Sequence, residues 1–96
     1  MRRDDVLRIL SEHRADIARF GVRSIAIFGS VARDEAGPES DVDALIEVNR
    51  PFGYFAFFAL EEYLEGILGR PVDLFTPGSL RDDARAVAMK EAVRAA

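Results

Sequence analysis

The sequence contains no cysteine and no tryptophan, and it has a single histidine among its 96 residues. The absence of cysteine excludes disulfide-stabilised scaffolds, thiolate zinc sites and cysteine nucleophiles. One histidine is too few for a histidine-rich metal site and argues against a catalytic relay built on imidazole. The chain also lacks a hydrophobic run long enough to span a bilayer, because its longest apolar stretch is only Tyr54 to Leu60.

The sequence has fewer basic than acidic residues, with 13 Lys and Arg and 17 Asp and Glu, which gives a net charge of −4. Such a chain has no electrostatic attraction for nucleic-acid phosphates, so direct nucleic-acid binding is disfavoured. The N-terminal segment turns acidic at Asp4 and Asp5 and has no apolar core of a signal peptide. We therefore expect a soluble, cytoplasmic protein that does not bind membranes, with residues 1–96 forming a single domain.

Hydrophobic spacing predicts alternating helices and strands. Residues 4–20 carry apolar side chains at helical spacing and predict one N-terminal helix, capped by Asp4 or Asp5 and ended by Gly21. The apolar run 24–28 predicts a central strand that is covered on both faces.

The remaining elements follow from the same patterns. They are a short helical turn at 31–35, a strand at 41–48, a helix at 52–68 ended by Gly69, a strand at 72–75, and a last helix opened by a capping box of Ser79 and Asp82. The order α-β-α-β-α-β-α predicts a mixed α/β (α+β) domain with three or four strands.

Two aspartates lie at the start of the predicted strand 41–48. Asp41 and Asp43 project from the same face, about 7 Å apart at their α-carbons. Their charges repel, and a bound divalent cation such as Mg²⁺ or Mn²⁺ would relieve the repulsion. Asp73 could reach the same face from the strand 72–75. Spacing alone leaves two interpretations open, a metal site or ordinary surface acids at strand ends.

The pair Gly29-Ser30 directly follows the first predicted strand. A glycine and a small hydroxyl at this point allow backbone N–H groups to approach a phosphate. The pair is common in loops, and it is not a P-loop because no Gly-Lys-Ser/Thr follows. Together with three carboxylates on later strands, however, it supplies the parts that metal-dependent phosphoryl transfer needs.

These motifs have a family resemblance. Residues 29–33 (Gly-Ser-Val-Ala-Arg) and 40–43 (Ser-Asp-Val-Asp) resemble the Gly-Ser … Asp-x-Asp signature of the DNA polymerase β-like nucleotidyltransferase superfamily. With residues 69–74 (Gly-Arg-Pro-Val-Asp-Leu), the chain is similar to the minimal nucleotidyltransferases, the MNT antitoxins of HEPN–MNT toxin–antitoxin pairs. The resemblance covers essentially the whole chain. It implies a small nucleotidyltransferase fold, a mixed sheet of three to four strands with helices packed on it.

The resemblance also implies roles for the matched residues. Gly29 and Ser30 would hold the β- and γ-phosphates of the nucleotide. Two Mg²⁺ ions, with Mn²⁺ as a substitute, would be bound by the catalytic residues Asp41, Asp43 and Asp73, of which Asp73 lies at the metal beside the incoming hydroxyl.

Two residues after the glycine turn leave alternatives open. Arg33 either binds the nucleotide phosphates, the role that we assign to it, or pairs with a nearby acid. Asp34 stands where the family usually has glycine. Aspartate tolerates a left-handed backbone better than most residues, so we expect the turn to survive. An extra carboxylate near the phosphates would weaken nucleotide binding.

The activity implied by the resemblance is that of a Mg²⁺-dependent nucleotidyltransferase of the protein adenylyltransferase type (EC 2.7.7). It would move AMP from ATP to a hydroxyl of a partner protein, a HEPN toxin that is thereby silenced by its antitoxin. This hypothesis is compatible with a homo-oligomer of the chain and with a hetero-oligomer that includes the toxin. The alternative is a catalytically weak antitoxin, or a binding module, that neutralises its partner by direct contact.

Aromatic side chains are in excess at the start of the predicted helix 52–68. A stripe of apolar residues is sufficient to dock this helix on the sheet, namely Phe57, Leu60, Leu64 and Ile67 or Leu68. Tyr54, Phe55 and Phe58 exceed that need, so at least one of them should point away from the core. They form either a thick core edge or an exposed patch that marks a protein interface, and we favour the interface.

Overall fold

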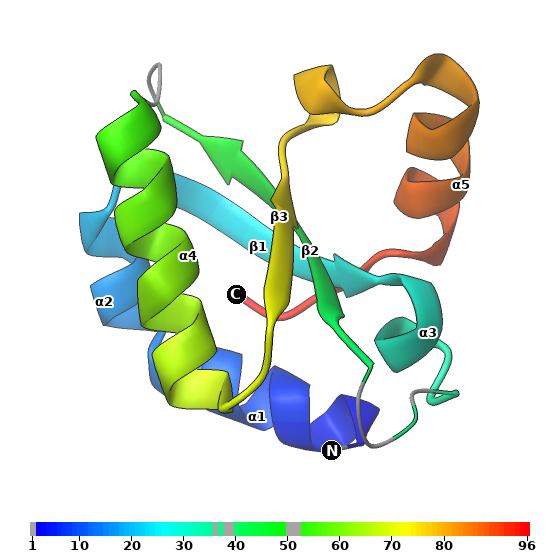
Figure 1. Ribbon diagram of the computed structural model, residues 1–96, viewed down its shortest axis with the longest axis horizontal. Coiled ribbons are helices and arrows are strands. Elements are labelled where there is room, and N and C mark those ends of the chain that lie inside the picture. Colours follow the sequence, from blue (N-terminus) through cyan, green and yellow to red (C-terminus); the bar gives the residue numbers. More distant parts are fainter. Residues whose placement is uncertain (1, 36, 38–39, 50–52) are drawn as a thin grey trace.

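The computed structural model describes residues 2–35, 37, 40–49 and 53–96, and these include one four-stranded sheet (Figure 1). The strand order is β3-β2-β1-β4. Strands β1 (Val22–Phe28) and β2 (Val42–Val48) pair antiparallel, β3 (Val72–Phe75) runs parallel to β2, and the short β4 (Val93–Arg94) is antiparallel to β1. The predicted mixed sheet is confirmed, although β4 was not among the predicted strands.

Helices lie on both sides of this sheet. Figure 1 shows α1 (Arg3–Glu12), α2 (Arg14–Arg19) and α4 (Tyr54–Leu68) on one face, and α5 (Asp82–Glu91) on the other. The short helix α3 (Gly29–Ala32) directly follows β1. No helix in the described part of the chain is long and apolar enough to cross a membrane.

The hydrophobic core lies between the sheet and the layer of α1, α2 and α4. The predicted stripe on α4 is confirmed, since Leu60, Leu64 and Leu68 are buried and Phe57 and Ile67 pack against the core. The opposite face is covered more thinly, because α5 buries only the small side chain of its Ala88. The sheet is therefore anchored from one side and open enough on the other to host a site.

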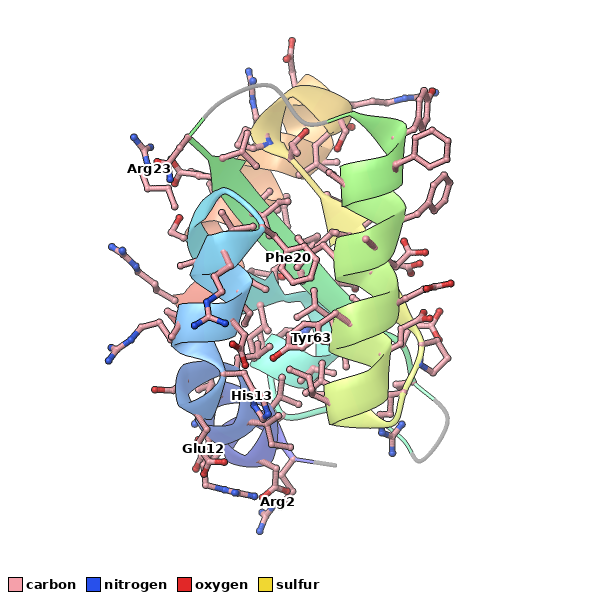
Figure 2. The ribbon with its side chains drawn as sticks, turned by 90° about the vertical axis from the view of Figure 1, so that its left-hand side faces the viewer. Arg2, Glu12, His13, Phe20, Arg23 and Tyr63 are labelled. Carbon is pink, nitrogen blue, oxygen red and sulfur yellow. The ribbon has the colours of Figure 1, made fainter. Side chains whose placement is uncertain are left out.

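The single N-terminal helix expected from apolar spacing is wrong, because the chain divides into α1 and α2 at His13. The backbone leaves helical geometry there, and His13 Nδ1 lies 2.8 Å from the Ile9 carbonyl oxygen. Figure 2 shows the His13 and Phe20 rings beside Tyr63 of α4, with ring centroids 6.2 and 5.4 Å from that ring. Apolar spacing continues through both helices, which is why the sequence pattern does not reveal the break.

Two predicted helix caps are also wrong. The N-cap of α1 is Arg2, whose backbone N–H donates to Asp5 at 3.1 Å, so Asp5 lies inside the first turn. Ser79 does not open α5 but closes a 3₁₀ turn, Pro77–Ser79, in which its hydroxyl accepts from the Thr76 N–H at 3.0 Å.

Other element ends differ less from the predictions. The N-cap of α5 is Arg81. The helical turn after β1 begins at Gly29 rather than at residue 31. The left-handed ends at Gly21 and Gly69 are confirmed, and the predicted start of the α4 helix at residue 52 lies outside the described residues.

Candidate active site

The glycine turn lies at the end of β1, against the second strand. Gly29 has φ +73°, in the left-handed region that glycine adopts without steric cost. A Cβ atom built on Gly29 would overlap Oδ2 of Asp43. The reason is the strand register, since Phe28, the residue before Gly29, is the cross-strand partner of Asp43. Any larger residue at this position would therefore displace the Asp43 carboxylate.

Two of the predicted acids are neighbours across the sheet, and the third lies just before the same strand as one of them. Asp43 and Asp73 are register partners in the parallel pair β2–β3, and Asp41 directly precedes β2. Asp43 is half-buried, whereas Asp41 and Asp73 are exposed. Burial, followed by the negative charges of Asp73 and Asp41, raises the pKa of Asp43 above its usual value. The site thus concentrates negative charge around a partly desolvated carboxylate.

The position of Asp41 is supported from the start of β3. Arg70 Nη1 donates to the Ser40 carbonyl oxygen at 3.1 Å. The backbone N–H of Val42 donates to the Pro71 carbonyl oxygen at 2.9 Å. The segment before β3 therefore holds the residues on both sides of Asp41, which was not apparent from the sequence.

The three aspartates are the candidate ligands for a divalent cation. In the described ranges, no three His, Cys, Asp or Glu side chains are gathered into a ready-made metal-binding group. The donor chemistry nevertheless fits a hard divalent cation, because Asp43 and its neighbours Asp41 and Asp73 offer only carboxylate oxygens. A cation beside Asp43 would also relieve the repulsion from Asp73 and Asp41 that, after burial, raises the pKa of Asp43.

Arg33 pairs with two acids in this structure. Its Nε donates to Glu35 at 2.6 Å, and its Nη1 donates to Glu91, the last residue of α5, at 2.9 Å. The bond to Glu35, followed by the charge of Glu91, raises the pKa of Arg33. Arg33 is also close enough to Asp43 to oppose the rise of that pKa. The guanidinium thus connects the glycine turn with α5 while remaining beside the carboxylates.

Asp34 adopts the left-handed backbone expected of it, with φ 59°. Its carboxylate accepts a hydrogen bond from the Arg3 backbone N–H at 3.1 Å. The side chain therefore binds the N-terminus of α1, where unpaired N–H groups and the helix dipole favour an anion. The extra carboxylate has a structural partner in this fold.

Two glutamates of α4 lie along β3. Glu65 accepts from the Val72 backbone N–H at 3.0 Å. Burial, followed by the charges of Glu65 and Asp73, raises the pKa of Glu61. The only sequence signal for this was their i, i+4 spacing, which places both on one side of the helix.

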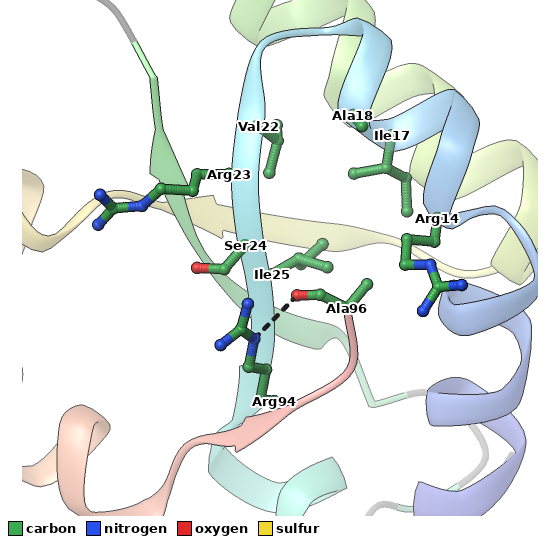
Figure 3. A pocket seen from close by; sticks show the side chains of 9 residues that line it. All are labelled: Arg14, Ile17, Ala18, Val22, Arg23, Ser24, Ile25, Arg94 and Ala96. Carbon is green, nitrogen blue, oxygen red and sulfur yellow. Dashed lines mark hydrogen bonds between the residues drawn. The ribbon is translucent and has the colours of Figure 1, made fainter.

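A separate cavity of about 160 Å³ lies at the other edge of the sheet, where β4 pairs with β1 (Figure 3). Arg94 Nε donates there to the Ala96 carbonyl oxygen at 3.3 Å. The floor is apolar, and the cationic side chains that line it are Arg14, Arg23 and Arg94. Arginines therefore gather at this edge, one of them, Arg23, paired with Glu47, whereas aspartates gather at the β3 edge.

Comparisons with known proteins agree with this geometry. Residues 6–95 match the family model of the nucleotidyltransferase domain. The chain is 40% identical over 91 residues to the protein adenylyltransferase MntA of Thermococcus cleftensis. The aligned stretch covers 94% of this chain and 92% of the relative.

Solved structures have the same fold. One described as a minimal nucleotidyltransferase has a TM-score of 0.83 at 33% identity, covering 97% of this chain and 95% of its own. A chain in the complex of tri-AMPylated Shewanella oneidensis HEPN toxin with MNT antitoxin has a TM-score of 0.67 at 16% identity, and the match covers 94% of this chain and 71% of that one. At this identity the match shows a likeness of fold alone. The chain belongs to the nucleotidyltransferase domain family, among the minimal, MntA-type members of the DNA polymerase β-like superfamily.

Proposed function

We propose that this protein is the antitoxin of a HEPN–MNT pair and silences its toxin by transferring AMP from ATP to a toxin hydroxyl in the cytoplasm. The proposal is supported by similarity to a protein adenylyltransferase along 92% of that relative's length. The observation that carries it is the contact between the glycine turn and the acids. Gly29 leaves room for Asp43, and Asp43 is in register with Asp73.

The phosphate-binding side of the site is the start of α3. Gly29 presents a backbone without a side chain, and Ser30 adds a hydroxyl directly after it. These are the groups that we assign to the β- and γ-phosphates of ATP. Arg33 would contribute its guanidinium after exchanging one of its carboxylate partners for a phosphate oxygen.

The metal-binding side consists of the three aspartates. Asp41 and Asp43 would hold two Mg²⁺ ions, and Asp73 would hold the one beside the acceptor hydroxyl. Bound divalent cations supply charge neutralisation of the phosphates and a lower pKa for the attacking hydroxyl. The partly buried Asp43 would be fully ionised in that state, because a nearby cation lowers the pKa that burial raises.

Neutralisation by contact alone remains the second candidate, and one observation favours it. Tyr54, Phe55 and Phe58 are all exposed, which suits a protein that binds its partner tightly. This observation does not require any chemistry at Asp43.

A single experiment separates the two functions. The toxin partner is incubated with this protein, ATP and Mg²⁺, and its mass is then measured. We expect a gain of one or more AMP groups with the wild type and no gain with the double variant Asp41→Asn/Asp43→Asn. If the wild type adds no mass while the double variant still neutralises the toxin fully, the protein acts by contact.

A further inference from the structure

Three aromatic side chains on the first turns of α4 form an exposed surface, which we term the aromatic patch. Tyr54, Phe55 and Phe58 are 82%, 93% and 55% exposed. The rings of Tyr54 and Phe58 are stacked, with centroids 6.2 Å apart. Other residues of α4 already fill the core, so these rings are not needed for folding. Contiguous exposed apolar surface of this kind marks an interaction site.

The aromatic patch continues into an acidic strip along the same helix. Helical spacing places Glu61 and Glu65 in line with Phe58, and Glu62 in line with Phe55. The sequence of α4 contains no lysine or arginine. One face of the helix is therefore apolar at its beginning and negatively charged toward its end.

This acidic strip leads to the candidate active site. The bond from the Val72 N–H to Glu65 holds α4 beside the outer edge of β3, as the ribbon also shows (Figure 1). Asp73 is the next residue of β3, and its charge reaches Glu61, whose pKa it helps to raise. The aromatic patch, the strip and Asp73 thus form one continuous surface.

The charge distribution indicates what this surface would accept. The basic residues around the cavity in Figure 3 lie at the β4 edge, whereas α4 lies at the β3 edge. A second copy docking through the same face would offer no lysine or arginine from its own α4 to pair with Glu61, Glu62 and Glu65. A partner with exposed apolar side chains and flanking lysine or arginine complements the face.

We infer that the aromatic patch and the acidic strip of α4 are the docking surface for the acceptor protein, whose contacting surface is apolar and basic. The inference rests on the proposed transfer reaction. A segment docked on α4 runs along β3 and brings its hydroxyl to Asp73, on the side of the site assigned to the acceptor. The surface thus selects which protein is modified, while the glycine turn and the aspartates perform the transfer.

The test compares two substitutions of matched exposure. Phe58 in the aromatic patch and Val87 on α5 are both 55% exposed, so Phe58→Glu and Val87→Glu introduce the same charge on equally open positions. Binding of the purified toxin partner is measured by calorimetry, and AMP transfer by mass spectrometry. Binding of ATP with Mg²⁺ and the melting temperature are measured without the partner.

We expect Phe58→Glu to weaken partner binding by about 100-fold or more, because the apolar part of the partner would bury a carboxylate that it cannot pair. Transfer should fall with it, while ATP binding and the melting temperature stay at wild-type values. Val87→Glu should change none of these. Glu62→Lys should also weaken the complex, with a difference that shrinks as salt is raised.

The inference is overturned if Phe58→Glu binds the partner as tightly as Val87→Glu does. It is also overturned if the wild type self-associates through the patch and Phe58→Glu only converts it to a monomer. Failure of the proposed reaction gives a different result. In that case Phe58→Glu abolishes partner binding, but the wild type transfers no AMP.

Discussion

Replacing Gly29 with alanine should remove activity without a matching loss of stability. The left-handed backbone at Gly29 costs an alanine about 1–2 kcal/mol. For a domain of this size, that corresponds to a fall in melting temperature of about 4–16 °C. The new Cβ also overlaps the end of the Asp43 side chain. Because the end of a side chain can rotate away, the collision adds little to the loss of stability but displaces the carboxylate.

Gly69→Ala is the matched control for this experiment. Gly69 ends α4 with φ +67°, close to the +73° of Gly29, but a Cβ there meets no atom within 4 Å. The two variants should therefore lose similar stability in thermal unfolding. Only Gly29→Ala should lose transfer, on the order of 100-fold, since a misplacement of about 1 Å at a reacting centre has that effect.

Two results would refute this reasoning. If both alanine variants transfer AMP equally well, the position of the Asp43 carboxylate does not matter to the reaction. If Gly29→Ala unfolds at a far lower temperature than Gly69→Ala, the overlap is absorbed by the backbone and not by the Asp43 side chain. Calorimetry of Mg²⁺ and ATP binding to both variants distinguishes a lost metal ligand from a lost phosphate contact.

Three further predictions concern the charges around the turn. The raised pKa of Asp43 means that its ionisation opposes folding above the usual carboxyl pKa of about 3.9. Without metal, Asp43→Asn should therefore have a higher melting temperature than the wild type near pH 7. This difference in melting temperature should close as the pH falls toward about 3 and should narrow when Mg²⁺ is added. Asp34→Ala should lower the free energy of unfolding in urea by about 1 kcal/mol, because the Arg3 N–H loses its acceptor. Asp34→Gly should leave the free energy of unfolding nearly unchanged, since glycine relieves the strain of the left-handed backbone and so offsets the lost hydrogen bond. Glu91→Gln should tighten ATP binding, measured by calorimetry, because it releases Arg33 from one of its carboxylate partners. Arg33→Gln should weaken ATP binding. An unchanged ATP affinity in Arg33→Gln would show that Arg33 is not part of the nucleotide site.

Local patterns predicted β1, β2, β3 and the helix α4 because the determinants lie within each of these elements, whereas β4 was not predicted. The alternation along β2 places Val42, Ala44 and Ile46 in the core and leaves Asp43 on the other face. The leucine stripe of α4 has the same local origin. Glycine at the end of α4 was predictable too, since few other residues adopt a left-handed backbone cheaply.

Contacts between distant segments could not be predicted in this way. Arg33 and Glu91 are 58 residues apart, and either could have paired with any neighbour of opposite charge. The bond between Glu65 and the Val72 N–H depends on how α4 packs beside an edge strand whose N–H groups need partners. The contact between the His13 ring and Tyr63 likewise joins two helices that are distant in the sequence.

The two motifs of the site are coupled through the sheet and not only through a ligand. The antiparallel register of β1 and β2 brings Phe28 opposite Asp43, so the residue after Phe28 must leave room for a carboxylate. Gly29 does so whether or not a phosphate is bound. Glycine at this position is therefore favoured twice, by the left-handed backbone of the turn and by the carboxylate of Asp43 beside it. Because one atom would disturb both, the Gly-Ser turn and the Asp-x-Asp strand form one structural unit, and that unit fits within a single small sheet.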